Sequence, residues 1–240
     1  MKRFIYPIIL SAFVLGSSFA AEPGASGVPP AAPDSAAAER AAAERAAAER
    51  AAAERAAAER LAAEKAAAER AVTAAVAGHR RALLGFDLNE LLTFCAPSYR
   101  ENDGNGVSRT YADLVKLAGY FHLMRTSDDL EAVMENALLL QEKAMSDYQR
   151  QQVRLLKGTD RGREILTMLR TNYERIAAQG RELAANIRVS AVRVNGDRAE
   201  ATLYLTDPIS RNTYRTDYQL VKSGNKWLVV KAEAKGVVKP

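Results

Sequence analysis

Seven alanine-rich pentads between Ala36 and Arg70 constrain the fold of this chain more than any other feature. Five copies of AAAER are followed by LAAEK and a further AAAER. Alanine has the highest helix propensity, and glutamate and arginine rank close behind it. Each pentad rotates an α-helix by about 140° beyond a full turn, so the charges spiral around the axis. The repeat therefore predicts a single helix that is polar on every side, without the apolar stripe of a packed helix or the heptad seam of a coiled coil.

The repeat region, 36–70, predicts a helical rod about 52 Å long. Within the repeat, arginine precedes glutamate by four residues, an order that adds only about 0.2–0.3 kcal/mol per pair. No helix breaker follows Arg70, so we expect one continuous helix over 36–84. We interpret the rod as a stiff spacer that holds a globular domain away from an N-terminal tether. The alternative is a repeat expansion that forms a helix without serving a function.

Export is indicated by residues 1–20, which combine a basic start with an apolar stretch. Ser18 and Ala20 stand at the spacing that a signal peptidase recognises, so we expect a mature chain that begins at Ala21. The expected location is the periplasm or the extracellular space, with no stable membrane span after cleavage; an uncleaved anchor helix is the alternative. Residues 21–35 are rich in proline, glycine and alanine and predict a disordered linker.

Composition argues against several classes of function. Lys and Arg number 34 and Asp and Glu 29, a net charge of +5 without a basic run, so no nucleic-acid partner is expected. The single cysteine, Cys95, cannot form an internal disulfide, and its apolar surroundings predict a buried structural thiol. The sequence contains no phosphate-binding loop, nucleophile motif or zinc-ligand spacing, so we expect neither a cofactor nor a metal.

Residues 71–240 predict an α+β domain. Capping boxes that begin at Asp87 and Thr110 mark the starts of two helices, and amphipathic helices continue through 126–185. Four alternating or β-branched segments fill the last fifty residues, with the turn signals NGD and SGN between them. The expected fold class is therefore α+β, with helices packed on one face of a curved antiparallel sheet.

The order of these motifs resembles the nuclear transport factor 2-like family, which includes the ketosteroid-isomerase-like enzymes. The resemblance rests on DLNELLTF, APSYRENDGNG, a further helix and strands that end in GNKWLVVKAEAK. It covers about 71–125 and 186–236, implies a cone of helices over a curved sheet, and makes 126–185 a long helical insertion. The family contains enzymes, ligand carriers and assembly modules, so the resemblance does not fix the function.

The same resemblance implies two catalytic candidates. Asp103 falls where the isomerases place their general-base aspartate, and His79 falls where they keep the tyrosine that donates to the oxyanion. The family's second, protonated aspartate has no counterpart that we can place. Taken from the residues alone, Asp103 is a turn aspartate in NDGNG, and His79 is an exposed residue beside two arginines. We expect any ligand pocket at the open end of the cone, lined by His79, Tyr99, Asp103, Phe94, Phe121, Leu203 and Trp227.

Three functions are compatible with these patterns. The first is a non-enzymatic envelope protein whose domain binds a protein or a small apolar ligand and stands on the helical spacer. The second is an isomerase or hydrolase that uses Asp103 as its general base. In the third, the helices of 128–185 form the partner surface and the cone is a scaffold. The sequence names neither the ligand nor the oligomeric state.

Overall fold

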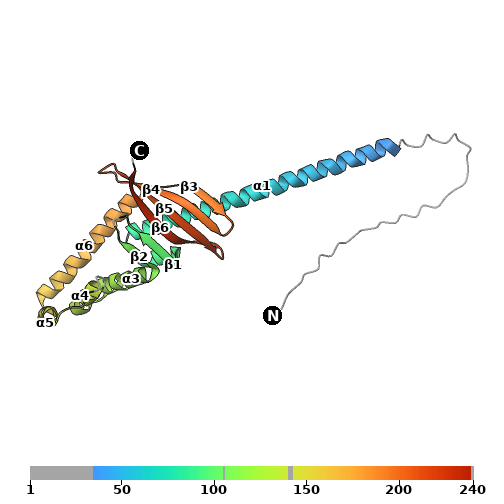
Figure 1. The fold of residues 1–240 in the computed structure, drawn as a ribbon. Helices are drawn as coiled ribbons and strands as arrows, with labels where there is room; N and C mark the ends of the chain where they lie inside the picture. Colours follow the sequence, from blue (N-terminus) through green and yellow to red (C-terminus); the bar gives the residue numbers. More distant parts are fainter. Residues whose placement is uncertain (1–34, 105, 140–142, 239–240) are drawn as a thin grey trace, which may run out of the picture. The chain divides into compact units, whose positions relative to one another are not determined.

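The computed structural model describes residues 35–104, 106–139 and 143–238. The predicted signal sequence, 1–20, and the predicted linker up to residue 34 lie outside the described residues. The chain divides into two units, Met1–Glu54 and Arg55–Pro240. The sheet and helices α2 to α6, drawn in Figure 1, belong to the second unit, as do the residues that line the cavities described below.

Helix α1, Ser35–Leu84, is continuous over 50 residues and confirms the helix expected over 36–84. Its side chains are exposed throughout 39–65, as a helix with spiralling charges requires. From Val72 onward one face of the helix is buried, because apolar residues recur there at helical spacing. The same helix is therefore a solvated rod at its start and a core element at its end.

The sheet has six strands in the order β2-β1-β6-β5-β4-β3. Strands β3 to β6 form the antiparallel meander expected from the C-terminal sequence, with tight turns at both predicted turn signals. Strand β1 lies parallel to β6, so the sheet is mixed rather than wholly antiparallel. The sequence gives no signal for this long-range pairing. The strand bounds are β1 Cys95–Asn102, β2 Ser108–Thr110, β3 Ile187–Asn195, β4 Arg198–Thr206, β5 Thr213–Ser223 and β6 Lys226–Val238.

Bulges curve the sheet. The register shifts within β3–β4 near Ala191, twice within β5–β6, and within β1–β6 around Pro97. Each shift within β3–β4 and β5–β6 adds one residue to one strand, and the β1–β6 shift adds three residues to β1. Such insertions increase the local twist and bend. Proline cannot donate to a ladder, which accounts for the irregular pairing of β1 with β6. The result is a curved, open sheet with one covered face, as expected for the fold class.

Five further helices accompany the sheet. Both predicted helix starts are present: Asp87 accepts a hydrogen bond from the Glu90 amide, and Thr110 forms a complete capping box with Asp113. Within the predicted helical insertion 126–185, residues 157–159 separate α5 from α6. The helix bounds are α2 Leu88–Phe94, α3 Tyr111–Thr126, α4 Leu130–Leu139, α5 Asp147–Leu156 and α6 Asp160–Ala184.

Two apolar clusters hold the second unit together. The larger joins the end of α1, helix α2 and Leu114 of α3 to the inward residues of β1, β4, β5 and β6. On β4 every second residue from Ala199 to Leu205 is buried, so one face of the strand meets the helices. The smaller cluster joins α3, α4 and α6, with Met124, Val133 and Leu166 at its centre.

The end of α1 and helix α6 approach each other closely at Gly180. A Cβ atom added to Gly180 would lie 1.8 Å from the backbone oxygen of Leu84. Only glycine permits this separation, so Gly180 fixes the position of α6 beside α1. Within the described part of the chain, no helix combines the length and hydropathy needed to cross a bilayer.

Candidate functional site

His79 lies in the core of the second unit. The side chain is fully buried, and its ring lies between Tyr99 of β1 and Tyr218 of β5, with centroid distances of 5.4 and 5.5 Å. Nε2 is 3.1 Å from the Tyr99 hydroxyl, and Nδ1 is 3.5 Å from the Tyr218 hydroxyl. The expectation of an exposed His79 is therefore wrong. His79 continues the buried face of α1 that Val72 and Val76 begin, at helical spacing.

Burial dominates the electrostatics around this histidine. It lowers the pKa of His79 to about 3, and the nearby Arg80 charge acts in the same direction. Burial also raises the pKa of Tyr218 to about 12 and raises that of Tyr99. The pKa of Cys95 rises to about 12, again chiefly through burial. At neutral pH the imidazole, both phenols and the thiol are all uncharged, so this centre is a satisfied polar network inside the core.

A cavity of about 480 Å³ opens beside this core, between the end of α1, strands β1 and β2, and helices α3 and α6. Eight of its fourteen lining residues are apolar and four are charged. Its size and mostly apolar wall are those of a small-ligand site. The apolar residues are Leu83, Leu84, Phe86, Leu88, Leu114, Leu117, Ile176 and Leu183.

The four charged residues of the cavity are Arg80, Glu101, Asp103 and Arg109. Glu101 is 5% exposed and forms an ion pair with Arg109 at 3.5 Å. Arg80 is half-buried, its side chain interacts with the Tyr218 hydroxyl, and it is in none of the ion pairs between described residues. Its Nε atom is buried and, among the described residues, has no hydrogen-bond partner. A buried donor without a partner costs free energy, and in native proteins such groups have a specific explanation.

Asp103 lines the same cavity and also builds the turn after β1. Its Oδ1 accepts a hydrogen bond from the Val107 amide at 3.1 Å, and its own amide donates to the Val107 carbonyl at 3.1 Å. His79 does not line this cavity. The structure therefore places Asp103 at the cavity and His79 in the adjacent core, and it does not bring the two together in one pocket.

The other residues expected at the pocket lie elsewhere. Tyr99, Leu203 and Trp227 are buried in the larger core cluster, and Phe94 packs against that cluster. Phe121 packs against the same cluster and lines a different pocket. None of these five residues lines the 480 Å³ cavity.

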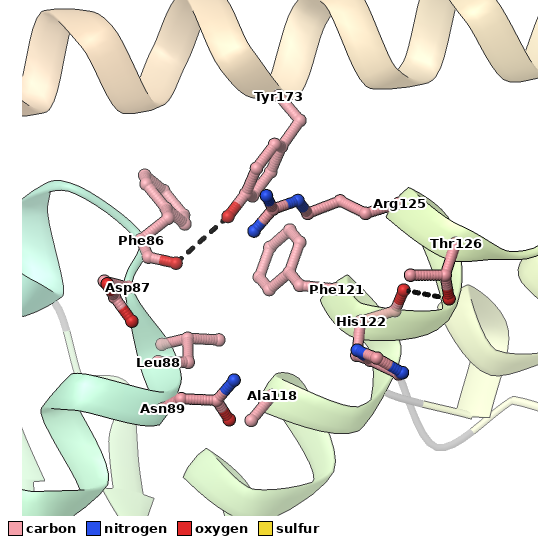
Figure 2. A pocket seen from close by; sticks show the side chains of 10 residues that line it. All are labelled: Phe86, Asp87, Leu88, Asn89, Ala118, Phe121, His122, Arg125, Thr126 and Tyr173. Atoms are coloured by element: carbon pink, nitrogen blue, oxygen red, sulfur yellow. Dashed lines mark hydrogen bonds between the residues drawn. The ribbon is translucent and has the colours of Figure 1, made fainter.

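A second pocket, of about 300 Å³, lies where α2, α3 and α6 meet (Figure 2). Phe86, Phe121 and Tyr173 form its aromatic wall, with ring centroids 4.9–6.0 Å apart. The Tyr173 hydroxyl donates to the Phe86 carbonyl oxygen at 3.0 Å, and Phe86 has a φ of 55°. This conformation is unfavourable for an aromatic residue, and the bond and ring contacts hold it at the corner between α1 and α2. His122 and Arg125, from the exposed side of α3, complete the rim.

Sequence reasoning missed Arg80, Glu101 and the leucines that line the larger cavity, although spacing signals for them exist. Arg80, Leu83 and Leu84 stand at i, i+3 and i+4, which places them on one side of a helix. Tyr99 and Glu101 are two residues apart on a strand and therefore point to the same face. The missing information was that α6 lines the same cavity, since residues 176–183 are remote from them in sequence.

Comparisons with known proteins do not identify a family. No protein-family model matches the sequence, and no curated protein matches it significantly. A de novo designed protein with a curved β-sheet aligns at 14% identity over 69% of this chain and 96% of its own, with a TM-score of 0.32. An uncharacterised cystatin-like protein from Caulobacter vibrioides aligns at 10% identity over 71% and 89%, with a TM-score of 0.33. A Xanthomonas campestris protein described as a calcium/calmodulin dependent protein kinase II association domain aligns at 12% identity over 70% and 87%, with a TM-score of 0.31. With TM-scores this low, we draw no activity from these similarities.

Proposed function

We propose that the domain of residues 71–240 binds a small molecule with an apolar body, without chemical turnover. The observation that carries this proposal is the cavity of about 480 Å³, whose wall is mostly apolar and whose few polar groups converge on one side. Burying an apolar ligand against leucine side chains supplies about 25 cal/mol per Å² of surface removed from water. The charged side of the cavity then sets the orientation of the ligand.

Binding is favoured over catalysis by the placement of the two catalytic candidates. A general base acts only within hydrogen-bond reach of the proton that it removes, and it needs a donor opposite to stabilise the resulting oxyanion. Asp103 lines the cavity, whereas His79 is enclosed by two tyrosines in the core. The pair implied by the isomerase resemblance therefore has no shared site, which supports a binding role.

We further propose that this domain is of the nuclear transport factor 2-like type and is exported, with α1 as its spacer. A curved sheet covered by helices on one face, with a cavity at the edge of that covered face, supports the first part. The exposed pentads support the role of α1 as a spacer, since a helix polar on all sides has no surface to pack. The basic start, apolar stretch and small residues of 1–20 support export. N-terminal sequencing of the protein from its native cell tests export: a chain that begins at Ala21 is expected, and an intact Met1 on a membrane-bound form would contradict it.

Binding is testable by filling the cavity. A thermal-shift screen with small amphipathic compounds should reveal ligands that raise the melting temperature, because a ligand that binds only the folded state stabilises it. Leu117→Trp places a large ring in the cavity and should abolish the shifts. Val115→Trp is the matched control, since Val115 is 46% exposed on the same helix and does not line the cavity. Equal shifts in both variants would show that the ligands bind elsewhere.

A pocket enzyme is the second candidate, favoured by the presence of Asp103 and Glu101 at the cavity. Turnover of small carbonyl and ester compounds should be compared in the wild type, Asp103→Asn and Glu101→Gln. The binding proposal expects background rates in all three. A wild-type rate that Asp103→Asn removes while the protein stays folded would establish the enzyme instead. The hypothesis that 128–185 forms a partner surface stays a prediction.

A further inference from the structure

We infer that the ligand of the 480 Å³ cavity carries an anionic oxygen group at one end of its apolar body, and that Arg80 binds this group. The inference rests on the proposed binding function and adds the chemical class of the ligand to it. The observation that carries it is that Arg80 lines the cavity without an anionic partner among the described residues, whereas the other charged lining residues have partners.

Arg80 is held in place but left without an anionic partner. It projects from the last turns of α1, next to the fully buried His79, and its side chain is half-buried. Its side chain interacts with the Tyr218 hydroxyl but is in none of the ion pairs between described residues, and its buried Nε lacks a hydrogen-bond partner among those residues. Arginine presents planar, bidentate donors that match carboxylate and phosphate oxygens. A ligand oxyanion in the cavity would supply the counter-ion that the described residues do not provide for this guanidinium.

The remaining charges of the cavity already have partners in the protein. Glu101 is bound to Arg109 at 3.5 Å, and this pair stands at the β1–β2 edge of the cavity. Asp103 accepts a hydrogen bond from the Val107 amide within its turn. The formal charges of the four residues sum to zero, but only Glu101 and Arg109 form an ion pair with each other. Among the described residues, the cavity cation without a counter-ion is therefore Arg80.

The apolar wall begins beside this cation. Leu83 and Leu84 follow Arg80 by three and four residues on α1 and line the same cavity. Leu117 of α3 and Leu183 of α6 complete the wall. A ligand with an oxyanion at Arg80 would therefore lay its hydrocarbon along leucines. Carboxylate, phosphate and sulfonate heads share this chemistry, and the experiment separates them.

The test uses the full-length protein and a series of compounds with one decyl chain and different heads: decanoate, decyl phosphate, decyl sulfonate, decanol and decylamine, each below its micellar concentration. Calorimetric titration gives the affinity of each. We expect at least one oxyanion to bind about tenfold or more tightly than decanol, since hydrogen bonds to charged groups are among the stronger polar contacts. The order among the three oxyanions identifies the preferred head.

Arg80→Gln should bring the oxyanion affinity down to that of decanol while leaving decanol binding unchanged. Arg81→Gln is the matched control, because Arg81 is the next residue, is exposed and does not line the cavity. If Arg80→Gln fails to fold, the head-group order in the wild type still decides the question. Equal affinities for decanoate, decanol and decylamine, or tighter binding of decylamine, would overturn the inference and leave the binding function standing. No binding by any member would defeat both.

Discussion

Protonation of His79 should make the folded domain sensitive to mildly acidic pH. In the unfolded chain a histidine has a pKa near 6.5, whereas burial lowers the pKa of His79 to about 3 in the folded protein. Between these values the unfolded state binds a proton and the folded state does not. Stability from the neutral His79 is therefore present above pH 6.5 and is lost progressively as the pH falls toward 3.

The size of this effect follows from linkage. A difference of one pKa unit corresponds to about 1.4 kcal/mol, so lowering the pH from about 7 to about 4.5 should cost about 2.5 kcal/mol through His79 alone. This free energy changes little if the pKa of His79 in the folded protein is one unit higher, because the lower pH of about 4.5 still lies above that pKa. A loss of this size is a large fraction of the stability of an ordinary domain.

The measurement is urea unfolding followed by the fluorescence of Trp227. This residue is the only tryptophan and is 6% exposed in the larger core cluster, so its signal reports on the core and is insensitive to the alanine-rich helix. His79→Gln removes the titration and keeps a polar side chain. His122→Gln is the control, because His122 is the second histidine of the chain and is exposed.

The comparison to make is between the pH dependences, not between the absolute stabilities. Carboxylates such as Glu233, whose pKa is lowered to about 2 by Lys235 and Lys231, contribute equally to all three proteins and cancel in the difference. The wild type and His122→Gln should lose about 2.5 kcal/mol more than His79→Gln between about pH 7 and pH 4.5. Parallel losses in all three proteins would refute the buried, neutral state of His79.

Three other outcomes follow from the fold. A peptide of residues 36–70 should show strong helicity by circular dichroism at low temperature, and a coil spectrum would end the spacer interpretation. Gly180→Ala should destabilise the domain by about 1–3 kcal/mol through overpacking against a backbone oxygen, whereas Gly119→Ala, with nothing within 4 Å, should stabilise it by up to about 1 kcal/mol. Leu203→Ala should cost about 2–5 kcal/mol in urea unfolding, and Ile209→Ala, 92% exposed, should change stability by less than about 0.5 kcal/mol.

Local patterns predicted the elements of this fold well because they act within a few residues. The long helix, the capping box at Thr110 and the turns at 195–197 and 223–225 are all present. The parallel pairing of β1 with β6 joins segments more than 120 residues apart, and no local preference encodes it. The predicted helical insertion 126–185 contains the separate helices α4, α5 and α6.

The candidate site was harder to predict than the fold, because its chemistry depends on which neighbours cover each side chain. His79 beside two arginines has the composition of an exposed segment. Only the helical spacing from Val72 and Val76 reveals that it belongs to the buried face. Arg80 gives no local sign of lacking a partner, since that property depends on residues from β1, β2 and α6. For Asp103, the family resemblance predicted a place at the pocket, and the composition of NDGNG predicted its role in the turn.

The adjacent residues His79 and Arg80 should separate stability from binding. Successive helical residues point about 100° apart, so His79 lies between Tyr99 and Tyr218, while Arg80 lines the cavity and reaches the Tyr218 hydroxyl from that side. The polar groups of His79 have partners in the protein, whereas the Arg80 Nε has none among the described residues. We therefore expect His79→Gln to flatten the pH dependence of unfolding and to keep the preference for an oxyanion head. Arg80→Gln should remove that preference and keep most of the pH dependence, since burial is the larger cause of the lowered His79 pKa and the Arg80 charge the smaller. If either substitution altered both properties to the same extent, the two side chains would act as one site, and the division into a structural histidine and a ligand-binding arginine would be wrong.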